Sequence, residues 1–213
     1  MSSVAHENLL PAANSSAPRR SSMGWEWRCF FVPRDGADNA LACAGKPEER
    51  TDLYLPVSAA CGVKARGGSS EGTLEVKIRD GVADDGFERW SKEGVKASEL
   101  ARVLELAGHA QPEALRDRRV EVAKRRWQES VGGSAFSGVW AEQTDLRVTV
   151  GGAEAQRYRT VAVEGKRGAC ARPVAQLLTK CRASAVDGTL VICGYPEFVV
   201  ARCAGDEATP PPG

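Results

Sequence analysis

The chain has 213 residues and a formal net charge of +1 at pH 7, because 29 Lys and Arg nearly balance 28 Asp and Glu. A molecule this close to neutral has no general attraction for nucleic acid or anionic membranes. We therefore expect no specific nucleic-acid partner and no membrane partner, and any cationic function must be local. Seven cysteines stand at least ten residues apart, which excludes a C-x-x-C zinc or redox pair and favours reduced thiols in the cytoplasm.

The two ends of the chain have the composition of tails. Residues 1–23 are rich in Ser, Ala and Pro, which predicts a disordered segment, although Arg19 and Arg20 leave a weak organelle transit peptide open. Residues 204–213 predict a second tail. The intervening residues 24–203 are expected to form one domain, and no apolar run in them approaches the roughly 20 residues that span a bilayer.

Eight segments of this domain have the residue pattern of strands. Each is bounded by Gly, Ser, Asp or Pro clusters, as strand ends usually are. The spacing between most of them suits hairpins, which favours an antiparallel sheet or a closed barrel. The predicted strands are residues 25–32, 51–57, 62–67, 73–80, 87–93, 119–128, 139–150 and 157–165.

Two segments have helical periodicity instead. Residues 96–109 and 172–184 repeat apolar side chains at the spacing of one helix face, and Pro173 is expected near the first turn of the second helix. Strands interrupted by two amphipathic helices predict an α+β fold, in which a mostly antiparallel eight-stranded β-barrel forms a tunnel with flanking helices.

Charged side chains alternate with apolar ones along several predicted strands. In residues 73–80, Glu75, Lys77 and Arg79 share one face, because successive strand side chains point to opposite sides. Lys64 and Arg66 likewise share one face of their predicted strand. Periodicity leaves two arrangements open. Charges that point outward leave an ordinary apolar interior, whereas charges that point inward line a polar tunnel whose outer faces need covering.

An inward arrangement would imply an anionic guest. Several cations cannot share a cavity of low dielectric without counter-charge. Phosphates fit best, because Arg and Lys donate charge-assisted hydrogen bonds to several oxygens at once. Residues 116–126 also have the composition of an RNA-facing patch, but Asp117 and Glu121 favour an ordinary solvated segment.

Short motifs follow one another in a recognisable order along the domain. They are Glu26-x-Arg28, Asp52-x-Tyr54, Lys64-x-Arg66, Lys77-x-Arg79, Lys124-x-Arg126, Asp145, Glu164 and Tyr195. This order resembles the CYTH domain, the triphosphate tunnel metalloenzyme fold, which includes thiamine triphosphatases, RNA triphosphatases and inorganic tripolyphosphatases. The resemblance covers about residues 24 to 200.

The resemblance implies a ligand and a cofactor. The ligand is a small molecule that carries a triphosphate or polyphosphate, and the cofactor is Mg²⁺ or Mn²⁺. The implied phosphate-binding residues are Arg28, Lys64, Arg66, Lys77, Arg79, Lys124 and Arg126. The implied metal ligands are Glu26 and Glu164, with Glu75, Glu88 and Asp145 as further candidates.

The chain departs from the family pattern at two carboxylates. The family carries paired glutamates on its first and last strands, whereas this chain has Gly24 before Glu26 and Ala162 before Glu164. Two-metal hydrolysis needs enough ligands to hold both ions. Two functions therefore stay open, a metal-dependent triphosphatase and a non-catalytic module that binds a phosphate ligand, and no residue is assigned as catalytic. A third alternative is an interaction protein whose charged faces are merely solvated.

Overall fold

The computed structural model describes residues 21–205 apart from 38–40, 42–45, 68–72, 107, 109–117 and 132–137. The two predicted tails lie outside this part of the chain, except for the few residues next to the domain. No helix of the described part is long and apolar enough to cross a membrane.

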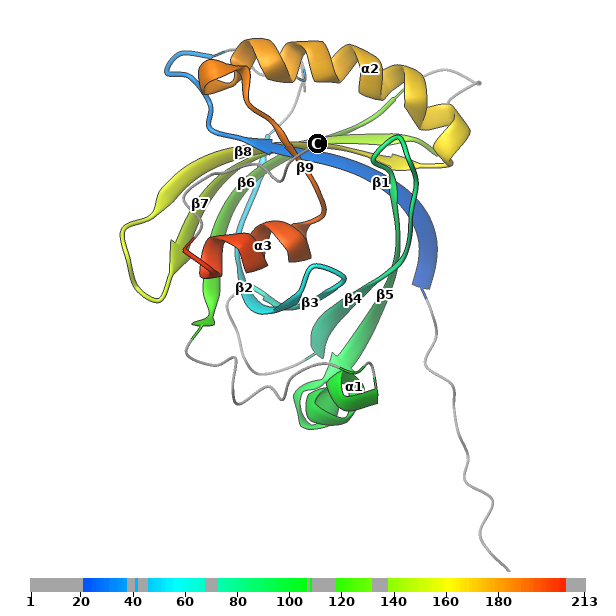
Figure 1. Cartoon of the computed structure of the whole chain (residues 1–213), viewed down its shortest axis with the longest axis vertical. Helices are drawn as coiled ribbons and strands as arrows, with labels where there is room; N and C mark the ends of the chain where they lie inside the picture. The colour runs from blue at the N-terminus through cyan, green and yellow to red at the C-terminus, as the bar shows by residue number, and fades with distance from the viewer. Residues whose placement is uncertain are drawn as a thin grey trace, which may run out of the picture.

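Eight strands form a closed antiparallel barrel (Figure 1). Their order is β5-β4-β3-β2-β6-β7-β8-β1, and β1 pairs again with β5 to close the ring. The strands are β1 Ser21–Phe31, β2 Glu48–Ser58, β3 Cys61–Arg66, β4 Thr73–Val82, β5 Glu88–Lys96, β6 Val120–Ser130, β7 Trp140–Val150 and β8 Gln156–Gly165. The predicted fold class is confirmed, and each predicted strand is present. A short β9, Val191–Ile192, which was not predicted, pairs with β1.

The charged faces of the strands point into the barrel. In β4, Glu75 and Lys77 line the interior, while Val76 between them is buried in an apolar cluster on the other side. That cluster also contains Leu100 and Leu104, which belong to α1, Leu100–Leu106, preceded by a 3₁₀ turn at Ala97–Glu99. The inward arrangement is therefore the observed one, and α1 covers part of the outer face.

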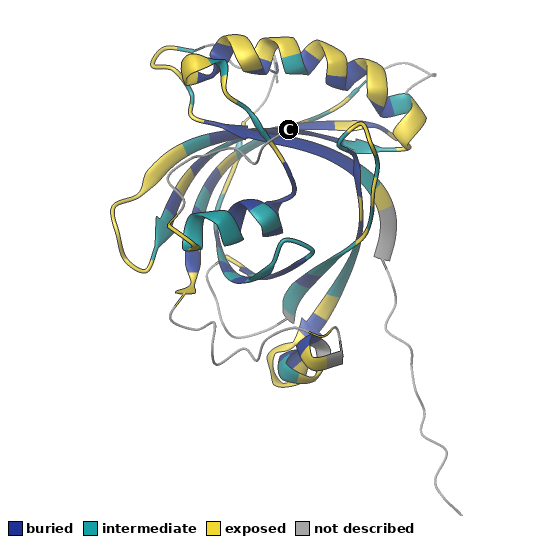
Figure 2. Cartoon of the chain, in the orientation of Figure 1, coloured by how far each residue is buried: buried dark blue, intermediate teal, exposed yellow. Residues whose placement is uncertain are grey.

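A second helix covers the outside of the barrel at β1 and β8. Helix α2, Arg167–Ser184, lies across these strands, and its buried stripe faces theirs (Figures 1 and 2). Trp27 and Val161 contribute to this apolar layer, together with Val174 and Leu177 of the helix. The expectation that Pro173 lies near the first turn is wrong, because α2 begins at Arg167 and Pro173 is buried inside it.

A third helix closes one end of the barrel interior. Helix α3, Tyr195–Cys203, lies within the ring of strands in Figure 1. Phe198 stacks on Phe30 of β1 with ring centroids 4.0 Å apart, in a buried cluster that also holds Val122 and Leu146 from the inner faces of β6 and β7. The interior is therefore apolar at the end where α3 lies and charged at the other end.

Candidate functional site

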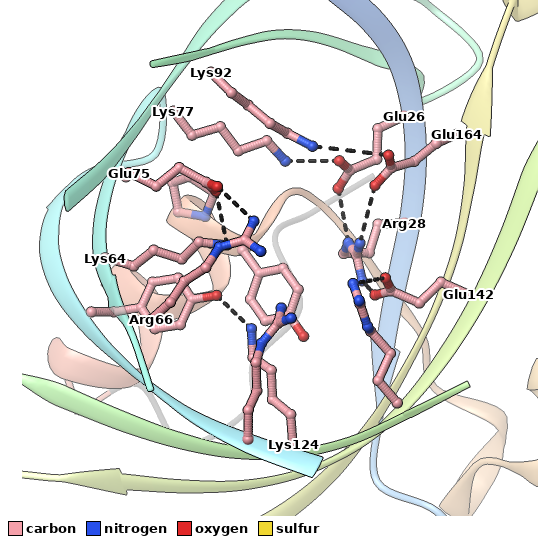
Figure 3. A pocket seen from close by; sticks show the side chains of 16 residues that line it. Glu26, Arg28, Lys64, Arg66, Glu75, Lys77, Lys92, Lys124, Glu142 and Glu164 are labelled. Carbon is pink, nitrogen blue, oxygen red and sulfur yellow. Dashed lines mark hydrogen bonds and ion pairs between the residues drawn. The ribbon is translucent and has the colours of Figure 1, made fainter. Parts of the chain in front are cut away.

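The charged end of the interior contains a cavity of about 70 Å³ (Figure 3). All eight barrel strands contribute side chains to it. Its cationic residues are Arg28, Arg50, Lys64, Arg66, Lys77, Lys92, Lys124 and Arg126. Its carboxylates are Glu26, Glu75, Glu142 and Glu164, and Tyr54 and Tyr195 also line it. Eight cations thus face four carboxylates on the wall. Asp52 and Glu48 beside the cavity pair with Lys124, Arg50 and Arg126, and a smaller excess of positive charge remains.

Arg28 lies among three of the carboxylates. Its Nε donates to Glu26 Oε1 at 2.8 Å and its Nη1 donates to Glu142 Oε1 at 3.0 Å, while Nη2 lies 3.9 Å from Glu164 Oε1. Lys77 Nζ donates to the second oxygen of Glu26 at 2.8 Å. Burial raises the pKa of Glu26, but the charges of Lys77 and Arg28 outweigh it and hold this pKa well below its usual range.

Glu142 is also held in its ionised form. Its second oxygen accepts from Arg126 Nη1 at 3.3 Å and from Gln128 Nε2 at 3.1 Å. Burial opposes ionisation, but the charges of Arg28 and Arg126 lower the pKa of Glu142 to about 2. Arg126 also pairs with Glu48. This side of the cavity is therefore a connected network of charge-assisted hydrogen bonds.

Lys124 marks the boundary between the charged and apolar ends. Its Nζ donates to Asp52 Oδ2 at 2.8 Å and to Tyr54 Oη at 2.6 Å, and it lies 4.2 Å from the ring centroid of Tyr195. Burial, followed by the charge of Lys64, lowers the pKa of Lys124 to about 7. The Tyr195 hydroxyl is buried and makes no hydrogen bond within the described part of the chain. Both residues line the cavity.

Lys64 and Arg66 share one carboxylate on the opposite wall. Lys64 Nζ lies 2.9 Å from Glu75 Oε1, and Arg66 Nη2 donates to Glu75 Oε2 at 2.6 Å. Burial opposes ionisation of Glu75, but the charge of Lys64 and the hydrogen bonds from both cations lower the pKa of Glu75 to about 2. Two cations for one carboxylate leave positive charge uncompensated here.

Most of the predicted site residues meet at this cavity, but three do not. Arg79 and Glu88 form their own partly buried pair, with Arg79 Nη1 donating to Glu88 Oε1 at 2.6 Å and to Glu197 of α3 at 3.1 Å. Burial raises the pKa of Glu88. Asp145 lies on the outer face of β7, where it accepts from Arg159 Nε at 2.6 Å. Arg79, Glu88 and Asp145 therefore do not line the cavity that the other predicted residues share.

Sequence reasoning missed three residues that line the cavity. Arg50 was missed because the strand was predicted to begin at residue 51, whereas β2 begins at Glu48. Lys92 lies four residues after Glu88 on β5, so the alternation of strand side chains puts both on the same face and could have revealed Lys92. Glu142 is the cross-strand partner of Ala162, so a carboxylate on β7 lies beside the position where the resemblance led us to expect one on β8.

The RNA-facing patch considered for residues 116–126 is divided between two faces. Residues 116 and 117 lie outside the described part of the chain. Within β6, Lys124 and Arg126 line the cavity, while the Arg125 side chain is 58% exposed and pairs with Glu49. The run of cations in the sequence is therefore not a continuous surface.

The carboxylates do not form a metal centre by themselves. In the described ranges, no three His, Cys, Asp or Glu side chains are arranged to hold a metal ion. Both oxygens of Glu26 are engaged by cations, and Arg28 lies between Glu26 and Glu142, as Figure 3 shows. The guanidinium group of Arg28 thus occupies the position between the two carboxylates at which a shared metal ion would have to bind. These residues do not fit Mg²⁺ or Mn²⁺ held by the protein alone.

The comparisons with known proteins leave the family open. No protein-family model matches the chain. No curated protein matches it either. Among solved structures, the chain is similar to the conserved hypothetical protein Pfu-838710-001 from Pyrococcus furiosus, with 13% identity and a TM-score of 0.39, over 71% of this chain and 90% of that one. The closed barrel with a charged interior fits a tunnel-like domain.

Proposed function

We propose that the protein is a divergent CYTH-like tunnel domain that binds a triphosphate- or polyphosphate-bearing small molecule in its cationic cavity. The observation that carries this proposal is the excess of cations at the inner wall, where eight cations face four lining carboxylates and the adjoining Asp52 and Glu48. Uncompensated charge in a partly enclosed site is costly, and an anionic guest removes that cost. Phosphate oxygens match the donors of Arg and Lys.

The distribution of donors supports a chain of phosphates over a single one. Lys64 and Arg66 lie on β3, whereas Lys124 and Arg126 lie on β6, and β2 separates these strands. Donors on several walls suit a ligand with several charged groups. Because α3 fills the apolar end, the ligand would enter from the end at which β1 begins.

Two neighbouring arginines provide a matched test. Arg126 lines the cavity and pairs with Glu48 and Glu142, whereas Arg125 lies on the outer wall and pairs with Glu49. Inorganic tripolyphosphate is titrated calorimetrically, in EDTA, into the wild type, Arg126→Ala and Arg125→Ala. We expect binding by the wild type, a loss of affinity of about tenfold or more in Arg126→Ala, and a change within about twofold in Arg125→Ala. Absence of binding by the wild type, or equal effects of the two variants, would overturn the proposal.

Hydrolysis of the terminal phosphate by a metal-dependent triphosphatase is the second candidate, and Glu164 is the observation that favours it. Its carboxylate is 38% exposed, and among the described residues its ion pairs are two long ones, each 3.9 Å, with Arg28 and Lys92. Mg²⁺ in proteins is often held by one or two carboxylates together with phosphate oxygens of the substrate. Phosphate release from tripolyphosphate is measured with Mg²⁺ or Mn²⁺ for the wild type and Glu164→Gln. Release that requires metal and Glu164 supports the enzyme, and no release favours the binding module.

A further inference from the structure

Lys124 places a buried amine at the wall of the cationic cavity (Figure 3). Its side chain is 3% exposed, and its Nζ donates to Asp52 Oδ2 at 2.8 Å and to Tyr54 Oη at 2.6 Å. A lysine amine is a nucleophile only in its neutral form, which has a free electron pair. Burial and neighbouring cations are the two conditions that favour this form.

Both conditions are met at Lys124. Its Nζ and that of Lys64 lie 4.9 and 5.9 Å from the ring centroid of Tyr54, so two amines share one aromatic ring. Arg50 Nε lies 3.2 Å from Asp52 Oδ1 and thus shares the carboxylate that Lys124 contacts. Burial, followed by the charge of Lys64, lowers the pKa of Lys124 to about 7, and Arg50 acts in the same direction. A large fraction of this amine is therefore neutral at neutral pH.

The same surroundings suit an anion attached to the amine. The guanidinium carbon of Arg28 lies 4.6 Å from the ring centroid of Tyr195, and Lys124 Nζ lies 4.2 Å from that centroid. The Tyr195 hydroxyl is buried and has no hydrogen-bond partner among the described residues. An anion on Lys124 would thus lie among cations and beside a hydroxyl that can donate to it.

We propose that Lys124 reacts reversibly with carbon dioxide to form a carbamate, so that the cationic cavity contains a modification site. The electron pair of the neutral nitrogen forms a bond to the carbon atom of carbon dioxide, and one C=O electron pair moves to oxygen. The nitrogen then loses a proton to Asp52 Oδ2, from which the proton passes to solvent. One amine and one carbon dioxide thus give one carbamate anion and one proton, without oxidation or reduction.

The modification would change the charge of the cavity. It replaces a partly protonated amine with an anion, which Lys64, Arg50 and Arg28 stabilise. Carbon dioxide should therefore compete with any phosphate ligand for the same cations. The inference goes beyond the proposed function, because carbamate formation needs no phosphate ligand.

The site is mapped first in the wild-type protein, so that the result does not depend on the folding of a variant. The protein is equilibrated with carbon-labelled bicarbonate, carbamates are observed by NMR, and triethyloxonium traps them as ethyl esters for peptide mass spectrometry. Lys180, exposed on α2, is the internal control. We expect occupancy at Lys124 at least about tenfold above that at Lys180, because an ordinary lysine with a pKa of about 10.4 is almost fully protonated at neutral pH. Equal occupancy at both, or label on Lys64 in place of Lys124, would overturn the proposal.

Two pairs of variants then test the nucleophile and its surroundings. Lys124→Arg keeps the charge but removes the nucleophile, so it should eliminate one carbamate resonance, whereas Lys180→Arg should not alter that resonance. Arg50→Gln should lower the occupancy of Lys124 about threefold or more, and Arg172→Gln, on the exposed side of α2, should leave it unchanged. A spectrum unchanged in Lys124→Arg, or full occupancy in Arg50→Gln, would overturn the proposal. Tripolyphosphate is titrated separately in buffer free of carbon dioxide, so its failure to bind would overturn the proposed function alone.

Discussion

The two ends of the barrel interior are built from the same strands and differ in the side chains that they carry. Along β1 the inner face changes from Arg28 at the charged end to Phe30 at the apolar end, and along β6 it changes from Lys124 to Val122. The apolar end is packed with α3, whereas the charged end keeps a cavity. One end can thus supply the burial that stabilises the barrel while the other carries a concentration of charge that a packed core would not tolerate.

The largest expected effect concerns the apolar end. Phe198 of α3 is buried and stacks on Phe30, so Phe198→Ala would leave a cavity at the centre of this cluster. We expect the free energy of unfolding to fall by about 3–5 kcal/mol, measured by guanidinium denaturation. Val200→Ala on the same helix is the control, because Val200 is only partly buried. A loss below about 1 kcal/mol in Phe198→Ala would show that α3 does not stabilise the barrel.

The second effect concerns the dependence of stability on pH at the charged end. The pKa of Glu142 is about 2 in the folded protein, against an ordinary value of 4.5. A lowered carboxyl pKa stabilises the fold above pH 4.5, and this contribution is lost as the pH falls towards 2. Glu142→Gln should remove about 3 kcal/mol of this pH-dependent stability.

Denaturation curves collected between neutral and acidic pH measure this contribution. Glu121→Gln is the control, because Glu121 is exposed on the outer face of β6. If Glu142→Gln and the wild type lose stability in parallel as the pH falls, the network around Arg28 is not what holds Glu142 ionised.

The third effect is the uptake of a proton on binding. The pKa of Lys124 is about 7, so at neutral pH this amine is only partly protonated. A bound phosphate favours the cation and raises this pKa, so binding should take up a fraction of a proton near pH 7 and weaken as the pH rises. Titrations in two buffers of different ionisation enthalpy measure that uptake. Lys124→Arg should reduce it, because Arg stays protonated, and equal uptake in variant and wild type would refute the role of Lys124.

The smallest expected effect is an increase, not a decrease, in affinity for tripolyphosphate. Glu75 neutralises part of the charge on Lys64 and Arg66. Glu75→Gln should therefore strengthen tripolyphosphate binding about two- to fivefold, because more positive charge remains for the ligand. Calorimetric titration in EDTA and again with Mg²⁺ measures this change. Weaker binding by Glu75→Gln would indicate that the carboxylate itself holds the ligand, through a metal ion.

Alternation along the strands was enough to predict the barrel but could not tell which face lies inside. Val76 and Lys77 alternate in the same way whichever face is covered, and the answer depends on α1 and α2, which bury the apolar faces from outside. The expected helix start at residue 172 came from the apolar stripe and from Pro173, a residue type common in first turns, whereas α2 begins at Arg167 and contains this proline in its interior. The two residues of β9 are too few to show any period.

The candidate site was predictable wherever cations repeated with period two, as at Lys64 and Lys77. Glu142 and Asp145 show the limit of this reasoning. They lie three residues apart on one strand and so face opposite sides, but only the pairing register reveals that Glu142 is the inner one. Glu142 lies beside Ala162 because β7 pairs with β8 in this register. A motif within one strand carries no information about that pairing.

The most direct measurement is a crystal structure of the protein with inorganic tripolyphosphate. The proposed function predicts phosphate density inside the barrel, within hydrogen-bond distance of Lys124 and Arg126. Phosphates bound on the outer wall beside Arg125, or a barrel interior in which the ion pairs of Arg28 persist and no phosphate enters, would contradict it.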